Sequence, residues 1–335
     1  MTVHFAIIAS MSDDVETLSI VVPCHNDVPC IGPFVAAIDA LALPVAVEIV
    51  FVDDGSTDGT VDALRDLVKR RSDVRHISFS RNFGKDAAML AGMRAARGNY
   101  VVTMDVDLQD PPTLLPQMLE AVRSGRCESV ATRRVGRAGE PPIRAFFARL
   151  FYRMMRCFSE IELVDGARDY RLMSRHFCDA VISLPEVNRF TRGIYQWVGF
   201  KTEWLEFKHV PRIAGETSWS FFRLVRYAFD NLIAFSTFPL KLASCIGIAS
   251  CFCSFAALLF VIVRKLVLGD PVAGWPSLVC IIVFIGGIQL FVAGILGAYL
   301  AKTYSETKRR PPYLISETSD AMKTSASATS AATGS

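Results

Sequence analysis

Carboxylates follow the short apolar run of the segment VVTMDVDLQDPP, which spans residues 101–112. Asp105 and Asp107 stand two positions apart, and Gln109 comes two positions later. Residues two apart on a strand share a face, so both carboxylates can reach one ligand where the strand ends. Carboxylate oxygens suit Mg²⁺ or Mn²⁺, and magnesium is usually held by one or two of them while phosphates complete its shell. The triplet therefore predicts a metal–diphosphate site, with Asp105 and Asp107 as metal ligands and Gln109 beside the metal or the substrate.

Polar side chains also end two apolar runs nearer the N-terminus. They are Asn26, Asp27, Asp53 and Asp54. The two adjacent aspartates could accept hydrogen bonds from a base or a ribose, and Gly55 permits the tight turn that follows them. Simple helix capping explains the neighbouring Ser56 and Asp58, but it leaves the adjacent aspartates unexplained. Polar residues thus follow three separate apolar runs, which indicates that the three ends share one ligand site.

Two basic residues in the stretch SRNFGKDAA approach the same edge. Arg81 and Lys85 are placed to meet the oxygens of a diphosphate. Gly84 between them lets the backbone approach a ligand closely. Ordinary solvent-exposed cations are the alternative interpretation of this pair.

A sheet is needed to bring these residues together. Before residue 237, short runs rich in β-branched residues alternate with helical patterns. The expected strands are residues 18–23, 47–54, 74–80 and 100–107, and the expected helices are about residues 31–42, 58–71 and 84–97. This alternation predicts an α/β fold with a mostly parallel sheet flanked by helices. Ligands of such sheets collect at the carboxyl ends of the strands.

Two charge-free apolar segments follow, over residues 242–263 and 277–301. Each exceeds the roughly 20 residues that cross a hydrocarbon core of about 30 Å. A pair of buried globular helices is the alternative, but two such lengths in succession favour a membrane. The short link between the segments predicts a two-helix transmembrane hairpin.

Basic residues predict how the hairpin is oriented. Four flank the first segment on its N-terminal side and four follow the second: Arg212, Arg223, Arg226 and Lys241, then Lys302, Lys308, Arg309 and Arg310. The link carries only Arg264 and Lys265. The positive-inside rule therefore places both termini and the preceding domain in the cytoplasm, with the chain as a multi-pass protein of the inner membrane.

Small residues recur four positions apart in the second apolar segment, at Ala293 and Gly297 and at Gly294 and Ala298. Such spacing permits close helix contact and would allow a homo-oligomer to form through the transmembrane helices. Ordinary small-residue content explains the spacing equally well.

Composition excludes some classes of function. A formal net charge of +3 gives no support for nucleic-acid binding. Nine cysteines show no paired zinc spacing. An odd cysteine count without a disulfide framework fits a reducing compartment.

Several stretches together resemble the polyprenyl-phosphate glycosyltransferases, which include dolichol-phosphate mannose synthase and the bactoprenol glucosyltransferases and have a glycosyltransferase A-type fold. The stretches are VVPCHND, EIVFVDDGSTDGT, SRNFGKDAAMLAGMRAARGNYVVTMDVDLQDPP, DGARDYRLMSR and PRIAGETSWS. The resemblance covers about residues 17–312, including KRRPPY after the second apolar segment. It implies inverting, metal-dependent transfer of a sugar from a nucleotide-sugar, expected to be UDP-linked, to polyisoprenyl phosphate such as undecaprenyl phosphate.

The resemblance also implies roles for individual residues. Pro23, Asn26, Asp27 and Asp54 would line the nucleotide pocket, Asp169 would lie near the reacting centre, and Arg133, Arg212 and Ser218 would face phosphate groups. The chemistry of an anionic acceptor makes Arg134 and Arg137 further candidates. Asp169 is expected to orient the acceptor or to position cations more than to act as a base, because a phosphate monoester with a second pKa of about 6 is already ionised. Pairing of Asp169 with Arg168 or Arg171 is an equal structural alternative.

The expected organisation has five parts. They are an N-terminal extension (1–16), a cytosolic glycosyltransferase domain (17–215), an interfacial amphipathic helix (216–237), the hairpin (238–304) and a cytosolic tail (305–335) that is disordered from about residue 316. A second basic amphipathic stretch, residues 143–158, has either an interfacial or a core-facing interpretation. These helices would bring the active site to the membrane surface.

At two places this chain departs from the family pattern, and there the residue roles implied by the resemblance are in doubt. The family often has Tyr and then Asn-Glu where this chain has His25, Asn26 and Asp27, so contacts with the base can differ. It often has Glu where this chain has Ala298.

The sequence does not determine the sugar: glucose is the first choice, and N-acetylhexosamine, aminoarabinose and mannose are alternatives. A polysaccharide synthase and an inactive membrane scaffold are the competing functions.

Overall fold

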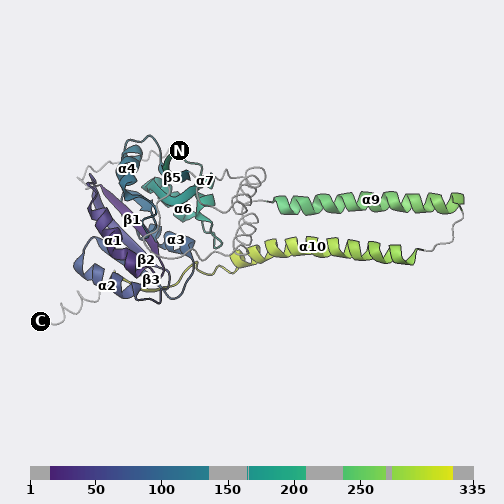
Figure 1. Cartoon of the computed structure of the whole chain (residues 1–335), viewed down its shortest axis with the longest axis horizontal. Coiled ribbons are helices and arrows are strands. Elements are labelled where there is room, and N and C mark those ends of the chain that lie inside the picture. Colours follow the sequence, from purple (N-terminus) through teal and green to yellow (C-terminus); the bar gives the residue numbers. More distant parts are fainter. Residues whose placement is uncertain (1–15, 136–163, 165, 209–236, 269–273, 320–335) are drawn as a thin grey trace, which may run out of the picture.

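The computed structural model describes residues 16–135, 164, 166–208, 237–268 and 274–319 (Figure 1). Within these ranges the chain forms a mixed α/β domain followed by two long helices. The predicted amphipathic stretches at 143–158 and 216–237 lie outside the described residues, apart from residue 237.

The sheet of this domain has eight strands in the order β7-β5-β6-β4-β1-β2-β3-β8 among the residues described. Their bounds are β1 Thr17–Cys24, β2 Ala46–Asp53, β3 Val74–Phe79, β4 Tyr100–Thr103, β5 Ser129–Val135, β6 Ala167–Ser174, β7 Thr202–Lys208 and β8 Ile315–Thr318. The pairs β1–β2, β1–β4, β2–β3 and β5–β7 are parallel. Strand β6 runs antiparallel to β4 and β5, and β8 runs antiparallel to β3. The prediction of a mostly parallel sheet flanked by helices is confirmed.

Helices cover both faces of this sheet (Figure 1). Their bounds are α1 Val28–Asp39, α2 Thr60–Arg70, α3 Lys85–Ala95, α4 Leu115–Arg123, α6 Arg175–Ser183 and α7 Thr191–Trp197. One core cluster joins α1, α2 and α4 to side chains such as Ile20 and Phe51, while Val21 and Val50 face clusters that include residues of α3. Because alternate residues of β1 and β2 are buried on opposite faces, both strands read as continuous apolar runs.

The fourth strand is shorter than expected. It ends at Thr103, so Asp105 and Asp107 lie in the loop that follows. Leu108 in this loop has a φ of 56°, which turns the chain away from the strand direction. The buried Met104 and Val106 explain why the sequence reads as a longer strand.

The prediction that disorder begins at about residue 316 is wrong for the first residues of the tail. Strand β8 pairs with β3, and Tyr313 stacks on Phe79 with ring centroids 5.0 Å apart. Glu317 accepts a hydrogen bond from Arg65 Nε at 2.8 Å. A Ser/Thr-rich composition carries no sign of these partners, because they lie more than 200 positions away in the sequence. Residues 320–335 are outside the described part of the chain.

The last two helices are α9 (Phe238–Leu268) and α10 (Trp275–Thr307). They extend side by side away from the α/β domain (Figure 1). Both contain windows long and apolar enough to cross a membrane, Phe238–Ala257 and Ile281–Thr307. Only 6% of each window is buried, unlike a core helix, so the two helices indicate association with a membrane.

Candidate active site

The loop after β4 places Asp105 beside two cations. Lys85 Nζ at the start of α3 lies 2.5 Å from Asp105 Oδ1, and Arg168 Nη2 of β6 lies 3.7 Å from Oδ2. Asp107 Oδ1 accepts a hydrogen bond from the backbone N–H of Gln109 at 3.2 Å. The loop thus presents two carboxylates, one of which already contacts an ammonium group.

Asp169 on β6 is the buried centre of this network. Its Oδ2 accepts a hydrogen bond from Lys85 Nζ at 2.7 Å. Arg192 of α7 contacts both oxygens, with Nε 2.6 Å from Oδ1 and Nη2 3.0 Å from Oδ2. Burial alone would raise the pKa of Asp169, but the charges and hydrogen bonds of Arg192 and Lys85 outweigh it and hold the pKa well below its usual range. Asp169 is therefore an ionised carboxylate that holds two cations.

Arg168 links the network to a second buried carboxylate. Its Nε donates to Asp110 Oδ1 at 3.1 Å, and its Nη2 donates to Gln109 Oε1 at 3.4 Å. Burial raises the pKa of Asp110 to about 6, the charge of Asp105 adds to this rise, and Arg168 opposes it. Residues 105–110 are consequently fastened to β6 through one guanidinium group.

The loops after β1 and β2 bond to each other. Asn26, with a φ of 57°, accepts a hydrogen bond at Oδ1 from the backbone N–H of Thr57 at 2.8 Å. Asp27 Oδ2 accepts one from the N–H of His25 at 2.9 Å. Burial raises the pKa of Asp27; the His25 bond opposes the rise, and the charges of Asp107 and Asp105 add to it. The loops after β1 and β2 therefore lie in contact, and the carboxylates after β4 are near enough for their charge to act on Asp27.

Asp53 and Asp54 brace the loops around them. Asp53 is fully buried and accepts hydrogen bonds from Ser78 Oγ at 2.7 Å and from the N–H of Ser56 at 3.2 Å. Asp54 accepts from the backbone N–H groups of Phe83 at 2.6 Å and Gly84 at 2.9 Å. These contacts place the residues that precede Lys85. Nucleotide binding by the two aspartates stays a prediction.

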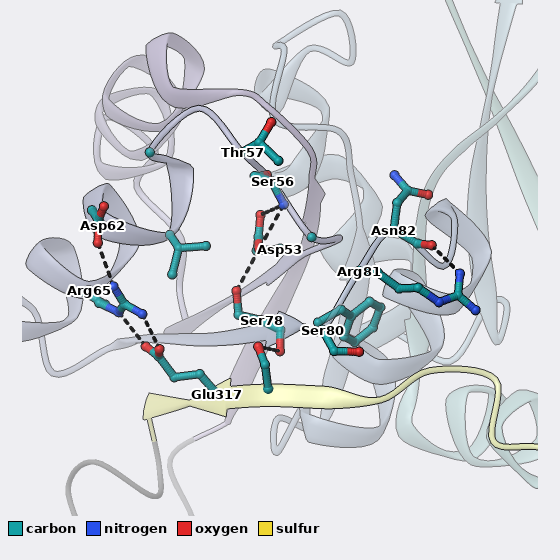
Figure 2. Close-up of a pocket in the computed structure, with 15 residues that line it drawn as sticks. Asp53, Ser56, Thr57, Asp62, Arg65, Ser78, Ser80, Arg81, Asn82 and Glu317 are labelled. Carbon is teal, nitrogen blue, oxygen red and sulfur yellow. Dashed lines mark hydrogen bonds and ion pairs between the residues drawn. The ribbon is translucent and has the colours of Figure 1, made fainter.

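A cavity of about 590 Å³ opens between the turn after β2, the end of β3 and β8. Figure 2 shows Asp53 and Ser78 at its centre, with the Arg65–Glu317 ion pair on one side and Arg81 on the other. Arg81 Nη1 donates to the carbonyl of Asn82 at 2.9 Å, and its guanidinium lies 4.0 Å from the ring centroid of Phe83. Strand β8 therefore contributes to the wall of a cavity that borders the predicted nucleotide residues.

Comparison with known proteins decides the family. The profile described as Glycosyl transferase family 2 matches residues 19–182. An uncharacterized glycosyltransferase of Synechocystis sp. is 37% identical over 302 residues, which are 90% of this chain and 95% of that protein. The chain belongs to glycosyl transferase family 2. Family membership confirms the predicted enzyme class and the resemblance drawn from the motifs.

Two further relatives share nearly the whole length. The bactoprenol glucosyl transferase of Shigella phage SfV is 37% identical over 300 residues, which are 89% of this chain and 97% of the relative. A prophage bactoprenol glucosyl transferase homolog of Escherichia coli is 36% identical over 300 residues, with shares of 89% and 98%. The likeness thus extends past the family 2 domain into the apolar helices.

The carboxylates of this site fit a metal ion whose coordination is completed by oxygens of the substrate. Among the residues that the structure describes, no three His, Cys, Asp or Glu side chains gather to form a metal site. Asp105 and Asp107 supply two carboxylates on one loop, which fits Mg²⁺ or Mn²⁺ completed by diphosphate oxygens. Metal binding by this pair stays a prediction.

The predicted acceptor arginines are only partly placed. Arg133 and Arg134 lie in β5 just before its last residue, Val135, and Arg133 forms an ion pair with Glu206 of β7. Their neighbour on β6 is the segment that begins at Ala167, directly before Arg168 and Asp169. Arg137, Arg212 and Ser218 lie outside the described residues.

Sequence reasoning missed Arg192 as the main partner of Asp169. The alternative that Asp169 pairs with Arg168 or Arg171 is wrong: Arg168 donates to Asp110, and Arg171 donates to Ser129 Oγ at 3.1 Å. Neighbouring residues of β6 point to opposite faces, so Arg168 cannot share the orientation of Asp169. No motif marked Arg192, whose position depends on the packing of α7.

Proposed function

We propose that the chain transfers a sugar, glucose in the first instance, from a UDP-linked donor to polyisoprenyl phosphate at the cytosolic face of the membrane. The observation that carries this is one charge network, Asp105–Lys85–Asp169–Arg192, in a domain joined to two apolar helices. Cations suit both a diphosphate leaving group and a phosphate acceptor. Relatives named bactoprenol glucosyl transferase support the lipid and the sugar.

The reaction we infer is a single displacement with inversion. An oxygen of the lipid phosphate attacks the anomeric carbon from the face opposite the diphosphate. The bond from that carbon to the donor's diphosphate oxygen breaks, and the nucleoside diphosphate leaves with the electron pair. Because the attacking phosphate is already ionised near neutral pH, no side chain has to remove a proton from it.

The residues of the chain supply charge and orientation. Mg²⁺ or Mn²⁺, when bound by Asp105 and Asp107, would neutralise charge that develops on the departing diphosphate. Lys85 and Arg168 add fixed positive charge beside that position. Asp169 keeps Lys85 and Arg192 oriented without becoming protonated. Arg133, Arg134, Arg137, Arg212 and Ser218 remain candidates for the acceptor phosphate.

The test uses the full-length protein in lipid nanodiscs with undecaprenyl phosphate and a panel of radiolabelled donors: UDP-glucose, UDP-N-acetylhexosamine, UDP-aminoarabinose and GDP-mannose. We expect label to enter the lipid phase with Mg²⁺ or Mn²⁺ and not with a chelator present. Asp107→Asn should lower this turnover about 100-fold. The matched control is Asp66→Asn on α2, which removes a carboxylate whose partner is the exposed Lys69.

Three results would contradict the proposal: no glycolipid from any donor, turnover that survives chelation, or equal activity of Asp107→Asn and wild type. Release of free sugar without lipid labelling would indicate a hydrolase. Transfer from a different donor in the panel would correct the sugar and leave the reaction class intact.

A further inference from the structure

Glu306 in the last turn of α10 contacts the α/β domain directly. Its Oε1 accepts hydrogen bonds from the backbone N–H of Asn188 at 2.9 Å and from Asn188 Nδ2 at 3.1 Å. The backbone N–H of Val187 lies 3.1 Å from each carboxylate oxygen. One carboxylate therefore binds two consecutive backbone donors in the segment between α6 and α7.

The position of Glu306 is unfavourable for its own helix. The carboxyl end of a helix carries a partial negative charge, which disfavours an acidic side chain in the last turn. Of the contacts that the structure shows for this carboxylate, those with Val187 and Asn188 offset that repulsion with charge-assisted hydrogen bonds. Lys302, one turn earlier on the same helix, adds a favourable charge, so this carboxylate is held by its own helix and by the docking contacts together.

The docked segment leads into the active site within four residues. Thr191 begins α7 and donates its backbone N–H to Asp86 Oδ1 at 2.9 Å, which fixes α7 beside the start of α3. Arg192 is the next residue and contacts both oxygens of Asp169. Lys85, which precedes Asp86, also contacts Asp169. The chain from Glu306 to the catalytic charge network is continuous.

A second anchor lies on the other side of α3. After α10 the chain continues to Tyr313, which stacks on Phe79, and to β8, which pairs with β3. Strand β3 leads, through residues 80–84, to Lys85 at the start of α3. Figure 1 shows the carboxyl end of α10 at the domain and the rest of the helix extending away. The carboxyl end of α10 is consequently fixed to the segment that precedes α7, which carries Arg192, and to the strand that precedes α3, which carries Lys85.

We propose that Glu306 is a positioning residue that sets the Arg192–Asp169 pair by docking the apolar hairpin onto residues 187–188. The proposal rests on the proposed function, because it assigns the membrane helix a part in arranging the site for a lipid substrate. Glu306 touches no reacting atom, and its effect passes through α7.

The test compares Glu306→Ala, Glu306→Gln and Thr307→Ala in full-length protein in nanodiscs. Glutamine keeps an oxygen acceptor for Val187 and Asn188, whereas alanine removes it. Thr307 is the matched control, because its hydroxyl bonds only to Tyr304 O in its own helix among the contacts described. Hydrogen exchange of residues 187–197 is measured by mass spectrometry, and kcat and KM are measured for sugar transfer.

We expect Glu306→Ala to raise exchange in residues 187–197 and to lower kcat, each about 10-fold, with the KM for the nucleotide-sugar unchanged. Glu306→Gln should recover most of both effects, and Thr307→Ala should match wild type. The kcat losses of Glu306→Ala and Arg192→Ala should be less than additive, because both act on Asp169. If Glu306→Ala does not fold, Asn188→Ala should give the same changes in smaller degree.

Unchanged exchange in Glu306→Ala would overturn the docking contact. Additive kcat losses, or a glutamine variant as defective as alanine, would overturn the positioning role. Hydrogen exchange needs no substrate, so it tests the contact even if wild type forms no glycolipid. In that case the proposed function fails while the docking contact is judged separately.

Discussion

At the scale of single residues, the carboxylates of the site differ in whether they form ion pairs with basic side chains. Asp169 is saturated by Arg192 and Lys85, and its pKa is held well below the ordinary value despite burial. A carboxylate in this state is a poor proton acceptor, since protonation would break contacts with both partners. Its chemistry is that of a fixed negative charge, which agrees with the proposed acceptor, a phosphate that is already ionised.

The pH dependence of turnover separates this role from base catalysis. We expect an acidic limb in kcat near pH 6, where the lipid phosphate gains a proton. The limb should stay there in Arg192→Lys, although kcat falls about 10-fold as the bidentate contact is lost. Measuring kcat from about pH 5 to 8 for both proteins checks this. Were Asp169 the titrating group, loss of the guanidinium would raise its pKa and move the limb upward.

At the scale of elements, β8 completes the edge of the sheet and lines the cavity beside the nucleotide residues. Its Glu317 accepts from Arg65 and lies 3.0 Å from His76 Nε2. The hydrogen bond from Arg65 is the largest cause of the lowered pKa of Glu317, which is about 2 against an ordinary 4.5. A segment distant in sequence is thus joined to β3 by charge as well as by backbone pairing.

Glu317→Gln should lower the free energy of unfolding at neutral pH by about 1 kcal/mol. This value is small because Arg65 is partly exposed and solvent screens the ion pair. A folded-state pKa below the ordinary one stabilises the folded protein above pH 4.5, and this contribution is lost as the pH falls toward about 2. Thermal unfolding across this range should show the two proteins converging at low pH. Glu203→Gln, in an exposed pair with Arg126, is the control and should have little effect. A difference independent of pH would contradict the assignment.

At the scale of the whole molecule, the proposed function has the apolar hairpin and the α/β domain serve one lipid substrate. A polyisoprenyl tail stays in the bilayer, so the domain has to work at the membrane surface. Glu306 and β8 attach the carboxyl end of α10 to two elements of the site. The proposed cytosolic orientation requires the link between α9 and α10 to lie on the opposite side of the membrane.

Thiol labelling in intact cells tests that orientation, in a variant whose nine native cysteines are replaced by serine. A cysteine introduced as Asp270→Cys in the link should react with a membrane-impermeant reagent from outside. A cysteine introduced as Glu203→Cys, in the α/β domain, should react only after the cells are opened. The positive-inside rule gives the physical reason. The opposite labelling pattern would place the active site outside the cell and contradict the proposed function.

The amino-acid sequence by itself determined the sheet's central strands, the two apolar helices and the acidic pair Asp105 and Asp107 after β4, although it predicted strand where the structure has a loop. These features are local, because apolar periodicity, turn residues and i, i+2 spacing all lie within about ten residues of each other. The antiparallel strand β6 and the edge strand β8 were not predicted. Their pairing partners lie far away in the chain.

Only the tertiary structure decided which charges meet. Arg192 reaches Asp169 because α7 packs beside α3, and Glu306 reaches residues 187–188 because α10 ends against the domain. No spacing rule connects residues separated by 23 or 118 positions. Ion pairs of this kind form when packing brings side chains within hydrogen-bond distance, so the partner of a charge is a property of the fold and not of the motif around it.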